Sequence, residues 1–177
     1  MLEEINHLAL IGSLMQQMCV YLVIAYLLSK TPLFAPLMQV TVRLPGKLVC
    51  YLVFSGFCVM GTYLGFQIEG AIANTRAIGA VLGGLLGGPI VGLAVGLTGG
   101  LHRYSLGGFT ASACAVSTTI EGLIGGCLHL YLLRRHRADR LLNPMIALGT
   151  TLCAELIHML IILLMARPSA PAARPAA

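Results

Sequence analysis

Residues 77–100 read AIGAVLGGLLGGPIVGLAVGLTGG, and this stretch decides the fold of the chain. Its glycines recur every four residues, in one ladder from Gly84 to Gly100 and in a second from Gly79 to Gly87. At that spacing glycines line one face of a helix, and a neighbouring backbone can approach closely, as in the GxxxG contacts of membrane helices. Hydropathy alone would draw the stretch as one helix that crosses a bilayer once. The charges elsewhere in the chain decide whether that drawing holds.

The composition predicts an all-α polytopic membrane protein. Of the 177 residues, 58% are hydrophobic and 10% are charged, and the mean hydropathy is +0.90. No water-soluble single domain needs so much apolar surface. The net charge of +5 lies in short breaks between apolar runs, where it sets membrane orientation and does not form a face for nucleic acid. The lipid bilayer is therefore an expected partner, and nucleic acid is not.

Four further apolar runs are long enough to cross a membrane, which takes about 20 residues. Within the first of them, the polar pair Gln16 and Gln17 is expected to face other helices, because polar groups are costly in lipid. The four runs cover Leu8–Leu28, Leu48–Phe66, Phe109–Leu133 and Met145–Met165.

Basic residues give the orientation of these runs. Lys30, Arg43 and Lys47 follow the first run with no acid among them, and the cluster Arg134–Arg140 follows the third. The positive-inside rule places both groups in the cytoplasm, so the Gly-rich stretch begins and ends outside. It must then cross an even number of times or dip in and return. We therefore place a break in it at Gly87-Gly88-Pro89.

The broken segment, residues 77–104, has two halves of marginal length for crossing a bilayer. Two arrangements are open, namely two short crossings and a re-entrant hairpin. Broken segments are tolerated where protein or a water-filled cavity surrounds the freed backbone groups, and in transporters they mark binding sites. We take residues 1–167 as one transmembrane domain. Residues 168–177, rich in proline and alanine, are expected to be a disordered tail.

A set of polar and reactive side chains is expected at the outer face, namely Arg76, His102, Arg103, Cys114 and Ser117. Two arginines near a partly dry pocket suit a small carboxylate, because each guanidinium offers a bidentate fork and stays charged. The thiol and the hydroxyl behind them would contact a second polar group of the ligand. The alternative is that both arginines snorkel to lipid headgroups.

A second set of polar residues lies near the middle of two successive spans. It contains Glu121 and Glu155, with His158 one turn after Glu155. Two interpretations are open: a proton or cation relay, and a structural buried pair. No nucleotide loop, Ser-His-Asp pattern or HExxH motif appears, and the six cysteines lack CxxC or CxxH spacing. We expect no metal, no cofactor and no enzymatic activity, and five of the six cysteines are interpreted as small buried apolar residues.

Two segments of the chain are distinctive, NTRAIG at residues 74–79 and GGLHRYS at residues 99–105. With their flanking sequence they resemble the N-terminal receptor module of LytS-type sensor histidine kinases, above all its pyruvate-sensing branch. The resemblance covers about Leu14–Pro168. Pyruvate binding in that branch is attributed to two arginines, a cysteine and a serine, which correspond by motif to Arg76, Arg103, Cys114 and Ser117.

The resemblance implies a multi-pass sensor of the bacterial inner membrane that binds pyruvate or a similar small carboxylate from the periplasmic side. It also implies a homodimer, or a partner kinase and response regulator in the intact system. Members continue after Pro168 into a further membrane helix, a GAF-like domain and a kinase; this sequence contains none of them, so we expect no autophosphorylation. More distantly, the module resembles the substrate-binding subunits of energy-coupling-factor vitamin transporters, a likeness of fold alone.

Two other functions stay open. The first is a small-carboxylate transporter, or the substrate-binding subunit of one, in which Glu121, Glu155 and His158 would couple transport to a proton or cation. The second is an anchor that binds no ligand and only dimerises a partner.

Overall fold

The structure, a computed structural model, describes residues 7–32, 44–68, 71–73 and 75–165. The predicted tail, residues 168–177, lies outside the described residues, as does most of the basic loop after the first helix. In chain order the elements are α1 (His7–Ser29), α3 (Leu44–Tyr63), β1 (Phe66–Ile68), β2 (Ala71–Ala73), α4 (Arg76–Gly87), α5 (Pro89–Ser105), α6 (Ala111–Arg134), the short 3-10 helix η1 (Ala138–Leu142) and α7 (Pro144–Met165).

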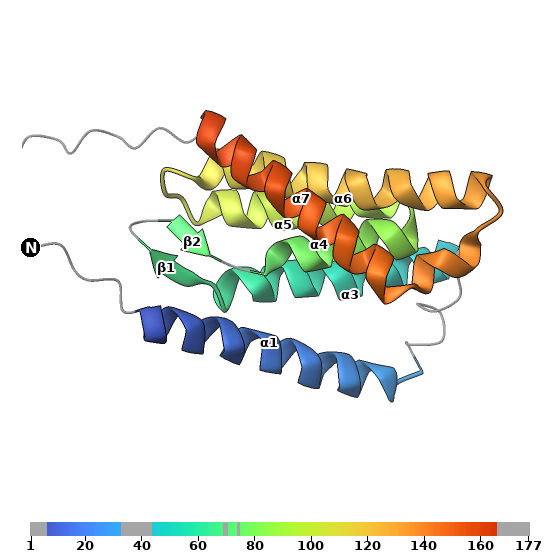
Figure 1. Ribbon diagram of the computed structural model, residues 1–177, viewed down its shortest axis with the longest axis horizontal. Coiled ribbons are helices and arrows are strands. Elements are labelled where there is room, and N and C mark those ends of the chain that lie inside the picture. Colours follow the sequence, from blue (N-terminus) through green and yellow to red (C-terminus); the bar gives the residue numbers. More distant parts are fainter. Residues whose placement is uncertain (1–6, 33–43, 69–70, 74, 166–177) are drawn as a thin grey trace, which may run out of the picture.

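The helices run along the long axis of the molecule, and α4 and α5 form an antiparallel pair inside the bundle (Figure 1). This pair packs against α3 and α6, while α7 packs mainly on α6. The β hairpin and the loop between α5 and α6 share one end of the bundle, hereafter the outer end. The turn between α4 and α5 points to the opposite end. The Gly-rich stretch therefore runs in and returns toward the outer end, as predicted, which fits both two short crossings and a re-entrant hairpin.

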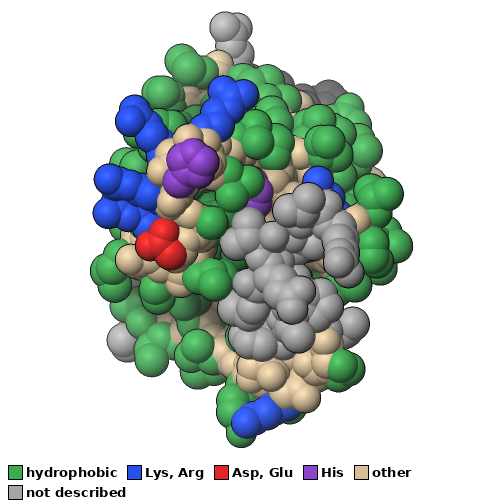
Figure 2. All heavy atoms as spheres, turned by 90° about the vertical axis from the view of Figure 1, so that its right-hand side faces the viewer, with side chains coloured by type: hydrophobic (Ala, Val, Ile, Leu, Met, Phe, Trp, Pro, Cys, Tyr) green, Lys and Arg blue, Asp and Glu red, His purple; other side chains and the backbone are tan. Residues whose placement is uncertain are grey.

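Basic side chains gather at that opposite end, hereafter the basic end, which Figure 2 views face on. Lys30 follows the last residue of α1, Lys47 lies in the first turn of α3, and the cluster Arg134–Arg140 follows α6. These three groups are far apart in the sequence but share one end of the bundle. That arrangement is the one the positive-inside rule predicts for a cytoplasmic face.

Gly88 separates α4 from α5 with a φ of 85°, a left-handed conformation that glycine adopts without a Cβ clash. Pro89 is the first residue of α5, a position where its missing N–H removes no helical hydrogen bond. The break predicted at Gly87–Pro89 is therefore confirmed. Helix α4 has 12 residues, which corresponds to about 18 Å against a hydrocarbon core of about 30 Å. Its length favours a re-entrant hairpin over two full crossings.

Close backbone approach holds α4, α5 and α6 together. A Cβ added at Gly84 or at Gly92 would meet the carbonyl oxygen of Gly122, and a Cβ added at Gly122 would meet the carbonyl oxygen of Gly92. Three helices can meet at this point only because each presents a glycine there. The packing predicted from the glycine ladder is confirmed at these positions.

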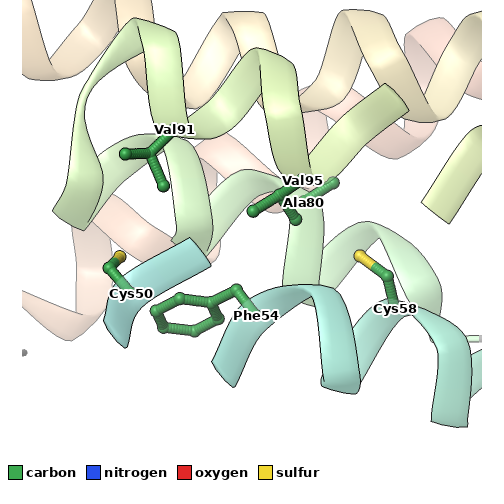
Figure 3. Close-up of a cluster of buried hydrophobic side chains, with 6 residues drawn as sticks. All are labelled: Cys50, Phe54, Cys58, Ala80, Val91 and Val95. Carbon is green, nitrogen blue, oxygen red and sulfur yellow. The ribbon is translucent and has the colours of Figure 1, made fainter. Parts of the chain in front are cut away.

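The main apolar core lies between α3 and the pair of α4 and α5. Figure 3 shows the side chains of α3 facing those of α4 and α5 across this interface. A second, smaller cluster near the basic end joins Leu85 of α4, Leu132 of α6 and Leu141 of η1. The main cluster comprises Cys50, Phe54, Cys58, Ala80, Val91 and Val95.

The outward faces of α1 and α7 expose apolar side chains, among them Leu22 and Leu163, that a bilayer would cover. Three described helices, α3, α6 and α7, are long and apolar enough to cross a membrane.

Three of the cysteines, Cys19, Cys127 and Cys153, are exposed. The prediction that they are buried is therefore wrong. Lipid tails are as apolar as leucine, so a small apolar side chain gains little from burial.

Three local predictions need correction. Gln17 is buried, and its Nε2 donates to the Leu64 carbonyl at 2.7 Å, but Gln16 is exposed. Helix α3 begins four residues earlier than predicted, at Leu44, because Pro45 is tolerated in a first turn. The polar stretch after α3 contains the short strands β1 and β2, paired antiparallel, a hairpin that the sequence did not predict beside the all-α bundle that it did.

Candidate functional site

Arg76 is the first residue of α4, and its side chain is completely buried. Its Nε donates to Thr118 Oγ1 at 2.8 Å, and one terminal nitrogen donates to Thr62 Oγ1 at 3.4 Å. Thr118 lies seven residues into α6, about 10 Å from the start of that helix. Arg76 thus stands at the start of its half-helix, as predicted, but its complete burial at the level of Thr118 was not predicted. The chain reaches this depth through the β hairpin, which the sequence did not reveal.

Arg103 lies in the last turn of α5 and is also completely buried. One terminal nitrogen donates to the Gly107 carbonyl at 2.5 Å and the other donates to Thr110 Oγ1 at 3.1 Å. The turn that presents this carbonyl contains Gly107 and Gly108, both at positive φ. Among the described residues, Arg103 Nε has no hydrogen-bond partner and no acidic side chain pairs with the guanidinium. Burial of both arginines contradicts the snorkelling alternative.

Cys114 and Ser117 lie on α6 beside these arginines, and both are buried. The Cys114 side chain interacts with Arg103 and with His158 of α7. Ser117 donates its hydroxyl to the Ala113 carbonyl at 2.9 Å, a bond within its own helix that leaves the oxygen free to accept. The structure thus brings Arg103 and Cys114 together, while Arg76 reaches α6 one turn deeper, at Thr118.

The predicted second set forms a cluster below Cys114, in which Glu121 and His158 are buried and Glu155 is half-buried. His158 Nδ1 lies 2.6 Å from Glu121 Oε1, and ligand atoms of Glu121, Glu155 and His158 all lie within 4.8 Å of one another. Glu121 is 1% exposed, and its Oε2 has no hydrogen-bond partner among the described residues.

The same three side chains are the ones that could hold a metal ion, since their donor atoms are close together. Two ligand atoms on one tetrahedral zinc lie about 3.3 Å apart, given metal–ligand distances near 2.0 Å. The 2.6 Å between His158 Nδ1 and Glu121 Oε1 is shorter than this and matches a charge-assisted hydrogen bond. The geometry of that pair therefore favours a shared proton over a shared metal.

His102 is set apart from the group around Cys114. Its ring packs against the Tyr63 ring of α3 with centroids 5.1 Å apart. Its Nδ1 is buried without a hydrogen-bond partner among the described residues. His102 was predicted as a possible site residue because it precedes Arg103, but its ring takes no part in the contact between Arg103 and Cys114.

Sequence reasoning missed the threonines that hold the arginines. Thr62, Thr110 and Thr118 are all buried and accept from Arg76 or Arg103. A signal for two of them was present, because Thr110, Cys114, Thr118 and Glu121 follow a spacing of three or four residues that places them on one face of α6.

A cavity in the described part of the chain lies away from the predicted site residues. It is an open apolar groove of about 350 Å³ between the outward faces of α5 and α6. None of the predicted site residues lines it, and its walls suit a lipid chain better than a carboxylate. Its lining residues are Leu97, Leu101, Ala115, Val116, Thr119 and Ile120.

Comparisons with known proteins give a family. The family model described as 5TMR of 5TMR-LYT matches residues 31–174. The sensor histidine kinase BtsS of Escherichia coli K12 is 64% identical over 161 residues, which cover 91% of this chain and 29% of the relative. The sensor protein LytS of Bacillus subtilis is 35% identical over 171 residues, covering 88% of this chain and 28% of the relative. This chain therefore spans less than a third of their length.

The sensor histidine kinase YpdA of Escherichia coli K12 is 30% identical over 144 residues, covering 80% of this chain and 25% of the relative. No solved structure matches the chain. The expected likeness to energy-coupling-factor subunits therefore stays a prediction.

Proposed function

Because this chain belongs to the 5TMR-LYT family of receptor domains of sensor histidine kinases, we propose that it binds pyruvate or a similar small carboxylate from the outer side of the bacterial inner membrane. Arg103 and Arg76 would hold the carboxylate, and Cys114 and Ser117 would face the keto end. The proposal deepens the family assignment, which by itself names no ligand.

The observation that supports it most strongly is the state of Arg103. Its guanidinium is fully buried, and in the described part of the chain it contacts a carbonyl, a hydroxyl and the Cys114 side chain, none of which is a carboxylate. A buried charge without an opposite charge is costly, and the Arg103 Nε has no hydrogen-bond partner among the described residues. A ligand carboxylate at Arg103 would supply both the missing charge and the missing acceptor.

The start of α4 adds to the positive charge around the proposed site. Arg76 sits at the N-terminus of the helix, where unpaired backbone N–H groups already concentrate positive charge. Two arginines and a helix N-terminus therefore face the upper part of α6. Cys114 lies between the levels of the two arginines, so a ligand beside it would reach both.

In the intact receptor, carboxylate binding would favour one packing of α4, α5 and α6, and a partner kinase would read that packing. A kinase, a response regulator and a second copy of the receptor are the partners expected from the sensor histidine kinases to which the chain is similar. Each of them belongs to this proposal.

A binding titration in lipid nanodiscs tests the carboxylate site. Pyruvate, lactate and acetate are compared with pyruvamide, which keeps the keto group but lacks the charge. We expect micromolar binding of one or more acids, no binding of pyruvamide, and an affinity lower by about 100-fold in Arg103→Ala, as the loss of a charged hydrogen-bonded pair predicts. Arg137→Ala is the matched control, because Arg137 is exposed at the basic end.

The transporter alternative is tested with the same protein. Labelled pyruvate that accumulates inside proteoliposomes, driven by a proton gradient, would contradict the receptor proposal. Binding without flux supports it. No heat with any of the acids would leave the anchor alternative standing and refute the site.

A further inference from the structure

The Glu121, Glu155 and His158 cluster has no role in holding the carboxylate, yet it lies directly beside the proposed site. His158 interacts with Cys114 on one side and with Glu121 on the other. The cluster joins α6 to α7, and two of its three members, Glu121 and His158, are buried. Glu121 Oε2, buried and without a partner among the described residues, is a vacant acceptor within it.

With the His158 ring neutral, the formal charges around the cluster balance before any ligand binds. Arg76 and Arg103 are two buried cations, and Glu121 and Glu155 are two carboxylates. Glu155 lies within electrostatic range of Arg76, Glu121 and His158, so these groups respond to one another. A ligand carboxylate paired with Arg103 would leave one negative charge in excess in a medium of low dielectric constant, which is costly.

We propose that the receptor takes up one proton together with its carboxylate ligand, and that Glu121, Glu155 and His158 hold this proton. The inference rests on the carboxylate site proposed above. It makes the cluster a second binding site, whose ligand is the proton and whose occupancy is coupled to that of the first.

The other titratable and charged groups that face the cluster cannot serve as the proton acceptor. Tyr21 of α1, Cys58 of α3 and Cys114 of α6 normally hold their proton at neutral pH, and Arg76 and Arg103 are always protonated. His102 of α5 packs against Tyr63, away from the cluster. Among the described groups that face the cluster, the two carboxylates and the imidazole are the ones left with a free site for a proton.

The hydrogen bond between His158 and Glu121 is where an added proton would act. With the proton present, the pair is an imidazolium with a carboxylate, or a carboxylic acid with a neutral imidazole. Without it, the ligand charge would face two carboxylates and a neutral ring. Because His158 belongs to α7, the last described helix, proton uptake would also change the contact between α7 and α6.

Calorimetry measures the proton directly. Pyruvate is titrated into the full chain in nanodiscs at pH 7, in phosphate and in Tris, whose ionisation enthalpies differ. We expect an uptake of about one proton per pyruvate, and a dissociation constant that rises about tenfold per pH unit above neutrality, as linkage requires.

The variants Glu155→Gln and Glu121→Gln each replace one carboxylate of the cluster with a permanently neutral amide. In each variant we expect binding to persist, uptake to fall near zero, and the affinity to vary less than twofold per pH unit.

His129→Gln is the matched control, because His129 is a buried histidine of α6 that bonds the Leu85 carbonyl near the basic end. It should keep the wild-type uptake. Pyruvate binding by the wild type without proton uptake, or uptake that persists in both glutamine variants, would overturn this inference and leave the carboxylate site intact. A wild type that binds no carboxylate would refute the proposed function, and the inference with it.

Discussion

The two halves of the core formed by α4, α5 and α6 bury different kinds of side chain. The outer half, from the α5–α6 loop to the level of Glu121, buries two arginines, a glutamate and the hydroxyls that contact them. The inner half, from Gly122 to the basic end, buries glycine contacts and the Leu85, Leu132 and Leu141 cluster. Its one buried histidine in the described part, His129, is satisfied by a carbonyl at 2.7 Å.

This difference separates stability from function within one set of helices. In the inner half every contact gains from close packing, and backbones approach because side chains are absent. In the outer half the same helices hold charges that packing alone does not satisfy. Glycine contacts hold the helices together in both halves, since Gly96 and Gly100 approach the backbone of α6 at Thr118 and Ala115. The outer half differs in its buried charges, and the proposed function places the ligand there.

The largest expected effect is on the inner half. Gly122→Leu would place a side chain against the backbone of α5 at Gly92, where no flexible group can give way, so we expect a loss above about 3 kcal/mol and no folded protein. Size-exclusion chromatography in detergent measures this. Gly149→Leu is the control, since a Cβ there meets nothing within 4 Å. Equal yields of the two variants would contradict the packing account.

A smaller loss is expected from Leu85→Ala, which empties a completely buried position in the inner cluster. A cavity of this kind costs about 2–5 kcal/mol. Thermal unfolding should show the loss, while the affinity for pyruvate should stay within about threefold of wild type. A large drop in affinity would show that the two halves are not separable.

Thr118→Val tests the outer half through an acceptor of Arg76. The substitution keeps the shape but removes the oxygen that accepts from Arg76 Nε at 2.8 Å, which costs about 1–3 kcal/mol for a buried charged donor. Thr119→Val is the matched control, because Thr119 bonds the Ala115 carbonyl of its own helix. Equal melting temperatures for the two variants would show that the bond from Arg76 to Thr118 does not stabilise the protein.

The smallest effect lies outside this core, on α1. Gln17→Leu breaks the bond to the Leu64 carbonyl and should cost about 1 kcal/mol, whereas Gln16→Leu changes an exposed position and should cost nothing or stabilise the protein in lipid. Chemical unfolding of both variants measures the difference. A greater loss in Gln16→Leu would mean that α1 faces a partner through that residue.

Much of the fold was predictable because charges and glycines act over short distances in the sequence. The cations at Lys30, Lys47 and Arg134 indicate which helix ends share a side, and that parity predicts the break at Gly87–Pro89. The β hairpin was not predictable, since its strands are only three residues each and show no usable alternation.

The missed hairpin also left the depth of Arg76 unpredicted. Its bonds to Thr62 and Thr118 could not be foreseen from the sequence. The pairing of Glu121 with His158 was equally hidden, because it joins residues 37 positions apart on different helices. The spacing of residues along one helix shows which of them share a face. Which other helix contacts that face depends on how the helices pack.

The most direct test measures affinity and stability in parallel for one variant from each half, Arg103→Ala and Leu85→Ala. The account predicts that Arg103→Ala loses about 100-fold in pyruvate affinity while its melting temperature stays close to that of wild type, and that Leu85→Ala shows the reverse. If both variants lose affinity and stability together, or if Arg103→Ala binds pyruvate as tightly as wild type, the division into a binding half and a packing half is wrong.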